Sequence, residues 1–128
     1  MRGLLFAALL APLALVQPGA AAAADDSQDS IDCSNPTTQL AMNICADKDY
    51  RRADDALNRA YKKAMAAEDD HGRELLRTAE RAWVKFRDAH CEYATSGSTG
   101  GSIHPMDYAN CVTQLTELRS KQLKEGTD

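Results

Sequence analysis

Apolar side chains recur every three or four residues between positions 76 and 93, which is the spacing of one face of an α-helix. The residues on this face are Leu76, Ala79, Trp83, Phe86, His90 and Tyr93. They include the only tryptophan and one of the two phenylalanines of the chain. The pattern therefore predicts a helix from about Arg73 to Ala94 that forms the centre of the fold.

A second helical pattern precedes this segment. Pro36 suits the first turn of a helix and Asn35 can cap it, so we expect this helix to run from Pro36 to about Ala67. Its apolar positions follow a nearly heptad spacing and are mostly small: Met42, Ala46, Tyr50, Ala53, Leu57, Ala60, Tyr61 and Ala64. Small side chains allow another helix to approach this one closely.

A third helical pattern follows, from about Met106 to Lys124, with Pro105 in its first turn. Its buried face is expected to consist of Tyr108, Cys111, Val112, Leu115, Leu118 and Leu123. The connection before it, residues 95–104, contains three glycines and is expected to be the most flexible loop. The earlier connection, residues 68–72, is short, and Asp69 or Asp70 can cap the helix that follows.

Three helices with short connections predict an all-α fold, a compact three-helix up-down bundle. The side chains expected in its structural core are Trp83, Phe86, Arg87, Leu57 and Leu115. Arg87 is included because a guanidinium near Trp83 can stack on an aromatic ring and bond to nearby carbonyls and carboxylates. Asp88 and Arg119 are expected to join it in a partly buried polar cluster.

The N-terminus has the three parts of a secretory signal peptide. A basic start at Arg2 is followed by an apolar run over residues 4–16 that is too short to span a bilayer, and then by a run of alanines. We place the cleavage near Ala24, which makes residues 1–24 the signal peptide, residues 25–32 an acidic disordered lead-in, and residues 33–125 the folded domain. No cysteine directly follows the apolar run, so lipid attachment there is not expected. The protein is therefore expected in the periplasm or secreted, without stable membrane insertion.

The charge of the folded part is nearly balanced. Removal of residues 1–24 leaves 14 basic and 19 acidic side chains, a net charge of −5. From Cys33 onward there are 14 basic and 15 acidic side chains, a net charge of −1, because four acids lie in the lead-in. A basic surface for nucleic acid is not expected.

Four cysteines in a short exported chain predict two disulfides. Their spacing contains no CxxC pair, so a metal site is not expected. Counting along the helices places Cys45, Cys91 and Cys111 at a similar height, with Cys33 in the coil beside them. This allows Cys33–Cys91 with Cys45–Cys111, which we favour slightly, or Cys45–Cys91 with Cys33–Cys111.

Residues able to support catalysis are few. Glu80 and Asp88 qualify as acid–base groups by type alone, and the three histidines, His71, His90 and His104, lie in separate segments without a metal-binding motif. We therefore expect no enzyme activity and no cofactor. A line of basic residues at four-residue steps, Arg73, Arg77, Arg81 and Lys85, is expected to be a solvated edge; the alternative is a contact strip for an acidic partner.

The order of several short motifs resembles the LprI-like lysozyme inhibitor domain. They are Cys33 with residues 38–46, Tyr50, residues 53–54 and 57–58, Tyr61, residues 82–83 and 86–88, Cys91, residues 100–102, Cys111, Thr116, Arg119 and Leu123. The resemblance covers nearly the whole expected mature chain. It implies a small secreted or periplasmic helical domain with paired cysteines, in a family whose founding member is a lipoprotein that inhibits lysozyme.

The resemblance implies a protein partner, such as a lysozyme, for the exported domain. Lysozymes are commonly basic, so the net negative charge of the exported protein would favour its encounter with a lysozyme. The binding residues are expected in the exposed loop between the second and third helices: Ser98, Gly100, Gly101, Ser102 and His104. The alternative function is a non-enzymatic envelope module that binds another protein through the basic line.

Overall fold

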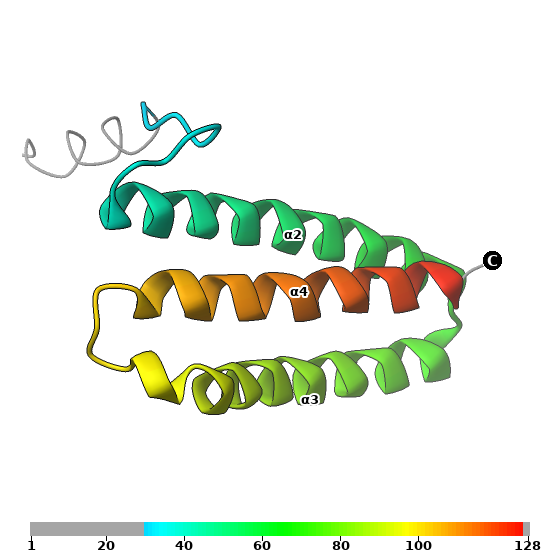
Figure 1. Ribbon diagram of the computed structural model, residues 1–128. Helices are drawn as coiled ribbons and strands as arrows, with labels where there is room; N and C mark the ends of the chain where they lie inside the picture. The colour runs from blue at the N-terminus through cyan, green and yellow to red at the C-terminus, as the bar shows by residue number, and fades with distance from the viewer. Residues whose placement is uncertain (1–29, 127–128) are drawn as a thin grey trace, which may run out of the picture.

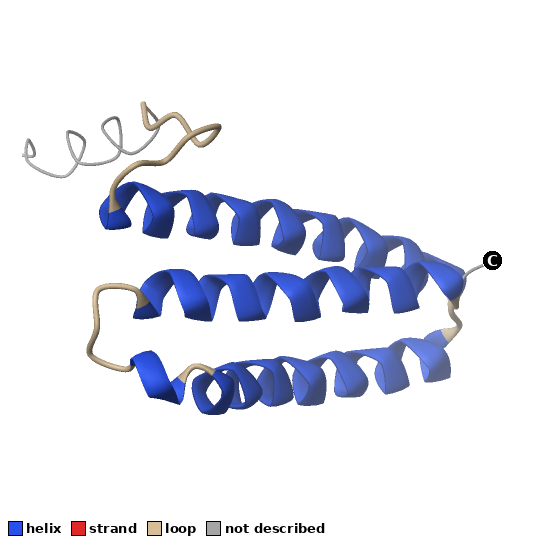
Figure 2. Ribbon diagram, in the orientation of Figure 1, coloured by secondary structure: helices blue, strands red, loops and turns tan. Residues whose placement is uncertain are grey.

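The structure, a computed structural model, describes residues 30–126, and the regular secondary structure of this part of the chain consists of helices alone. Its elements are α2 (Gln39–Ala67), α3 (Asp70–Ala94), the short 3₁₀ helix η1 (Ser96–Ser98) and α4 (His104–Glu125) (Figures 1 and 2). The predicted all-α three-helix architecture with two disulfides is confirmed. The predicted signal peptide, residues 1–24, and most of the lead-in lie outside the described residues.

The three helices are arranged around α4, which lies between α2 and α3 (Figure 1). α2 and α4 run in the same direction, α3 runs in the opposite one, and α4 packs mainly on α2. The prediction that residues 76–93 form the centre of the fold is therefore wrong. The centre is the parallel contact between α2 and α4.

This contact is made largely by small side chains. The buried residues of α2 are Cys45, Ala46, Ala53, Leu57, Ala60 and Ala64, and those of α4 are Ala109, Val112, Thr116, Ser120 and Leu123. Alanine, serine and threonine let the two backbones approach closely. The Ser120 hydroxyl is buried without a hydrogen-bond partner among the described residues. Small size, rather than hydrogen bonding, accounts for serine at this position.

α3 contributes less to the core than its pattern predicts. Its inward face carries Leu76 and Trp83, which pack against a cluster of Leu57, Ala60 and Leu123 on the other two helices. Of the core residues that the sequence predicts, Leu57 and Arg87 are buried, and Trp83 and Leu115 are partly buried. The prediction that Phe86 belongs to the core is wrong, because this side chain is 56% exposed. Residue 86 lies one position from Arg87, so when Arg87 points inward Phe86 turns about 100° away toward solvent.

Two other predicted core positions are also exposed. Tyr93 on α3 is 79% exposed, and Leu118 on α4 is 56% exposed. Thr116 and Ser120 flank Leu118 in sequence and face α2 in its place. The close approach of α2 and α4 favours these small residues over leucine at the contact.

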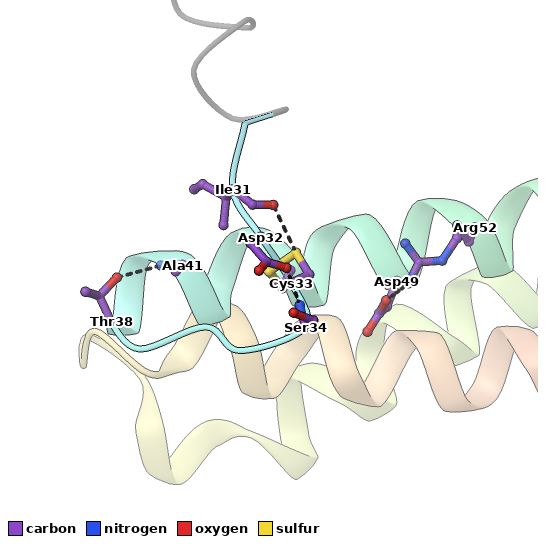
Figure 3. The surroundings of a disulfide bond; sticks show 9 residues. Ile31, Asp32, Cys33, Ser34, Thr38, Ala41, Asp49 and Arg52 are labelled. Carbon is purple, nitrogen blue, oxygen red and sulfur yellow. Dashed lines mark hydrogen bonds and ion pairs between the residues drawn. A yellow bond between two sulfur atoms is a disulfide. The ribbon is translucent and has the colours of Figure 1, made fainter.

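α2 begins at Gln39 rather than at Pro36, and its N-cap is Thr38 rather than Asn35. The Thr38 hydroxyl oxygen accepts a hydrogen bond of 3.1 Å from the Ala41 amide (Figure 3). A helix starting at Pro36 would place Cys33 about 14 Å or more along the axis from Cys45, too far for a disulfide. Instead the coil before Thr38 runs back beside the first turns of α2 (Figure 3).

The two disulfides are Cys33–Cys45 and Cys91–Cys111, with Cα–Cα distances of 5.5 and 5.7 Å. Neither pairing that we derived from helix heights is correct. Because the N-terminal coil lies along α2, the thiol nearest to Cys33 is that of Cys45. Cys111 lies on the side of α4 that faces α3, where it meets Cys91. The first disulfide fastens the coil, and the second joins the ends of α3 and α4 around the loop.

The packing of α2 against α4 predicts a strong effect of size at Ala53, which is 5% exposed. Replacing Ala53 by leucine should lower the free energy of unfolding by about 1–3 kcal/mol, because the added methyl groups have no space at the contact. The matched variant Ala66→Leu, on the exposed side of the same helix, should change it by less than about 0.5 kcal/mol. Denaturant unfolding followed by circular dichroism measures both. Equal effects at the two sites would contradict the close contact.

Candidate functional site

The loop between α3 and α4 is an ordered series of tight turns. The amides of Ser98, Gly101 and His104 donate hydrogen bonds of 3.0, 2.9 and 3.2 Å to the carbonyls of Thr95, Ser98 and Gly101, respectively. Gly100 adopts a φ of +82°, a conformation that disfavours other residues. The loop therefore has a defined conformation, whereas the sequence predicts a flexible one.

Side chains hold the predicted binding residues together. The Ser98 hydroxyl donates a hydrogen bond of 3.0 Å to the Thr95 carbonyl and lies 3.2 Å from Nδ1 of His104. The Ser102 carbonyl accepts a hydrogen bond of 3.0 Å from the Asn43 side-chain amide, so the loop is anchored to α2. Gly100, Gly101 and Ser102 are exposed at its surface. The structure therefore brings all five predicted residues into one small exposed feature.

A groove of about 570 Å³ adjoins this loop. It opens where α2, the end of α3 and the start of α4 meet, and it shares Asn43 and Pro105 with the base of the loop. The other lining residues are Ile44, Asp47, Tyr50, Arg51, Arg87, Asp88, Tyr108, Ala109 and Val112. Its volume suits a few side chains of a protein partner or a small molecule.

Arg87 forms the inner wall of the groove. Its Nε and Nη2 atoms each lie 2.8 Å from Oδ1 of Asp88, and its Nη1 lies 3.4 Å from the Thr116 hydroxyl on α4. The guanidinium carbon is 5.5 Å from the ring centre of Tyr50 on α2 and 5.3 Å from that of Trp83. A single buried cation thereby connects all three helices through hydrogen bonds and ring contacts.

The proton states of two groove residues are fixed at neutral pH. Burial alone lowers the pKa of Arg87, but the hydrogen bond that Arg87 donates to Asp88 and the neighbouring Tyr50 and Asp88 outweigh it and raise the pKa above its ordinary value. Burial, followed by the charges of Asp88 and Glu92, raises the pKa of Tyr108. The groove therefore presents a permanent cation, already paired, and a neutral phenol able to donate a hydrogen bond.

The chain segment that contains the loop is acidic, although Arg51 and Arg87 line the adjoining groove. From Asp88 to Leu118 the chain has four carboxylates, those of Asp88, Glu92, Asp107 and Glu117, and no lysine or arginine. This stretch comprises the end of α3, the loop and the first two thirds of α4. Asp88 is neutralised by Arg87, and the other three leave this stretch acidic in a domain whose net charge from Cys33 onward is −1.

The other candidate residues are engaged elsewhere. Glu80 forms an ion pair with Arg119 across α3 and α4, with Nε of Arg119 at 2.6 Å, so Arg119 does not complete the polar cluster predicted around Arg87. His90 stacks on Phe86 at a ring-centre distance of 5.5 Å, and His71 is exposed. Within residues 30–126, no group of three or more histidine, cysteine or acidic side chains is placed to hold a metal ion.

The basic line on α3 is largely neutralised by its own helix. Arg73 pairs with Asp70 at 3.1 Å and Arg77 with Glu74 at 3.0 Å, while Arg81 lies 3.8 Å from the same Glu74. Arg73–Asp70 and Arg77–Glu74 are three residues apart, the spacing typical of ion pairs on a solvated helix surface, whereas Arg81 reaches Glu74 from seven residues away. In the described part of the chain, no helix is long and apolar enough to cross a membrane.

The fold and its site define a small all-helical domain that is cross-linked by two disulfides and has an anchored loop beside a groove. Residues 32–123 match the model of a protein family, described as lysozyme inhibitor LprI, and this chain belongs to that family. Among curated proteins, it is 31% identical to lipoprotein LprI of Mycobacterium tuberculosis over 94% of its own length. The chain spans only 54% of that relative.

Other relatives have no named activity. The chain is 38% identical to uncharacterized protein R02472 of Rhizobium meliloti, with 81% of this chain and 84% of that protein covered. It is 26% identical to uncharacterized protein YecT of Escherichia coli, with 65% and 60% covered. No solved structure matches the chain significantly.

Sequence reasoning missed the groove and the anchoring of the loop. Asn43 gives no signal of its own, because an amide on the second turn of a helix is ordinary. Its role appears only when α2 and the loop are placed side by side. The position of Arg87 four residues after Trp83 gave one usable signal: it predicted a partly buried arginine close to Asp88, and this arginine lines the groove.

The contacts of Arg87 predict a large loss of stability when its charge is removed. Arg87→Met should lower the free energy of unfolding by about 2–4 kcal/mol, because the Thr116 hydroxyl and Asp88 both lose their partner. Arg77→Met, at an exposed site on the same helix, should cost less than about 1 kcal/mol. Denaturant unfolding monitors both variants. If Arg87→Met were as stable as Arg77→Met, Arg87 would not hold the helices together.

Proposed function

We propose that this protein is exported to the periplasm or secreted and there binds and blocks a cell-wall-cleaving lysozyme, with the α3–α4 loop as its contact surface. Membership of the lysozyme inhibitor LprI family supports this role. The observation that carries the choice of surface is the anchored, exposed loop that contains Gly100, Gly101 and Ser102.

The construction of the loop suits an inhibitor. The Cys91–Cys111 disulfide closes its base, and the hydrogen bond from Asn43 fixes Ser102. A preformed loop loses little conformational entropy when it enters a partner's cleft. The neighbouring groove offers space for side chains from the rim of that cleft. Inhibition by simple obstruction requires no chemistry from the loop itself.

The charge around the loop also favours this partner. The stretch from Asp88 to Leu118 carries carboxylates and no lysine or arginine. Lysozymes are commonly basic, so their approach to the loop region would be accelerated, and the wrong partners, acidic proteins, would be disfavoured. This effect depends on salt, because surface charges are screened within about 8 Å at physiological ionic strength.

The protein is proposed not to be an enzyme. Acid–base catalysis needs a carboxyl group that faces a substrate with a suitable proton state. The two candidates, Glu80 and Asp88, are paired with Arg119 and Arg87. In the alternative function, an envelope module binding an acidic protein through the basic line, Arg77 and Arg81 would have to leave Glu74. Charge reversal at these two arginines would abolish that binding and leave lysozyme inhibition unchanged.

The direct test is the rate of bacterial cell-wall lysis by lysozymes of several types, with and without the purified oxidised protein. We expect dose-dependent inhibition of at least one type, and loss of inhibition after reduction of the disulfides. Ser102→Arg should weaken inhibition at least about tenfold, because it places a bulky cation at the contact, where interface hot spots have effects of this size.

Two controls make this result specific. Ala66→Arg adds the same side chain at an exposed position near the C-terminal end of α2, at the end of the bundle opposite the loop, and should inhibit like the parent protein. Circular dichroism should show unchanged helix content in both variants. Full inhibition by Ser102→Arg would exclude the loop as the contact surface, and failure to inhibit any lysozyme type would contradict the proposed function itself.

A further inference from the structure

The outer face of α3 carries an uncovered apolar strip. Its members are Leu75, Ala79, Ala82, Phe86, Ala89 and Tyr93, all of which are exposed. The three large side chains, Leu75, Phe86 and Tyr93, are 59%, 56% and 79% exposed. α4 and α2 lie on the other side of α3 (Figure 1), so no helix within residues 30–126 covers the strip. A row of this length on one helix is typical of an interaction surface rather than of isolated surface residues.

The sequence spacing of the residues in the strip indicates which kind of structure can pack on it. Its successive members are four, three, four, three and four residues apart, which is the a/d pattern of a coiled coil. The inward face of α3, with Leu76, Trp83 and Arg87, is a different set of positions. α3 therefore has two faces, one for its own bundle and one with the geometry of a helix–helix seam.

We propose that this strip binds the same strip of a second copy of this chain, with the two α3 helices antiparallel. In the register that we assign, Phe86 of each copy packs on Ala89 of the other, and Tyr93 of each packs on Ala82 of the other. The four layers formed in this way each pair one aromatic ring with one alanine, and Leu75 and Ala79 lie beyond these layers, toward the N-terminus of α3. This proposal goes beyond the inhibitor function and concerns a different face from the exposed loop.

The charged residues beside the strip support a second copy of the chain as its partner, and they support the register given above. Lys85 and Glu92 occupy the positions that flank the strip on one side, and neither forms an ion pair within residues 30–126. In the proposed register Lys85 of each copy lies beside Glu92 of the other, so two symmetric ion pairs border the seam. A register shifted by one heptad, with Phe86 over Ala82, brings the two Lys85 side chains together and places alanine against alanine. The self-complementary arrangement is thus the one that satisfies both size and charge.

The first test is the molar mass of the oxidised protein, purified after export, by sedimentation equilibrium between about 1 and 500 µM. We expect a reversible dimer. Phe86→Glu should raise the dissociation constant at least about tenfold, because it places a charge in the seam. Leu118→Glu, at an equally exposed apolar residue outside the strip, should leave it unchanged. A parent protein that stays monomeric over this range, or equal effects of the two variants, would overturn the proposal.

The second test addresses the antiparallel register through two charge reversals. Lys85→Glu gives a chain with glutamate at both flanking positions, and Glu92→Lys gives a chain with lysine at both. Each variant alone should dimerise more weakly than the parent protein, whereas an equimolar mixture should form a heterodimer in which both ion pairs are restored, one of them with its charges exchanged. Circular dichroism confirms that both fold. A mixture no more associated than its components would contradict the register and the proposed seam.

Discussion

The close parallel contact between α2 and α4 determines how the rest of the molecule is built. Alanines on α2 and Ala109, Thr116 and Ser120 on α4 let the two backbones approach, but they leave few large apolar groups for a third helix to pack on. α3 is therefore joined to the pair mainly by specific links: the Arg87 contacts, the Glu80–Arg119 ion pair and the Cys91–Cys111 disulfide. The large apolar residues of α3 are divided between an inner face and an exposed one.

These links also position the candidate site. Arg87 and the second disulfide both lie near the C-terminal end of α3, where the loop begins. They hold this end of the bundle together more firmly than the small apolar core would do alone. The same arginine forms the inner wall of the groove, and Asn43 on α2 ties the loop to the contact between α2 and α4. Stability and the presentation of the proposed binding surface thus depend on the same few side chains.

Much of this architecture could be predicted from periodicity, and the exceptions share a cause. The small-residue line of α2, the Asp69 cap and the burial of Arg87 follow from local patterns. The position of Phe86 could not be predicted, because α3 is apolar on two sides and periodicity cannot tell which side faces the bundle. The prediction of the disulfide pairing failed for a related reason. The positions of Cys45, Cys91 and Cys111 along their helices could be estimated from the sequence, but no local pattern shows that the coil at Cys33 turns back along α2. The groove required all three helices to be in place.

The central claim is that the loop end of the domain is the surface that contacts lysozyme. Amide hydrogen exchange of the oxidised protein, alone and with excess lysozyme, tests this most directly, because it reports every segment in one measurement. We expect slower exchange in residues 95–104 and in the adjoining groove segments of α2 and α4, with the connection at residues 68–69 unchanged. Slower exchange confined to α3 or to that far connection, or no change with any lysozyme, would contradict it.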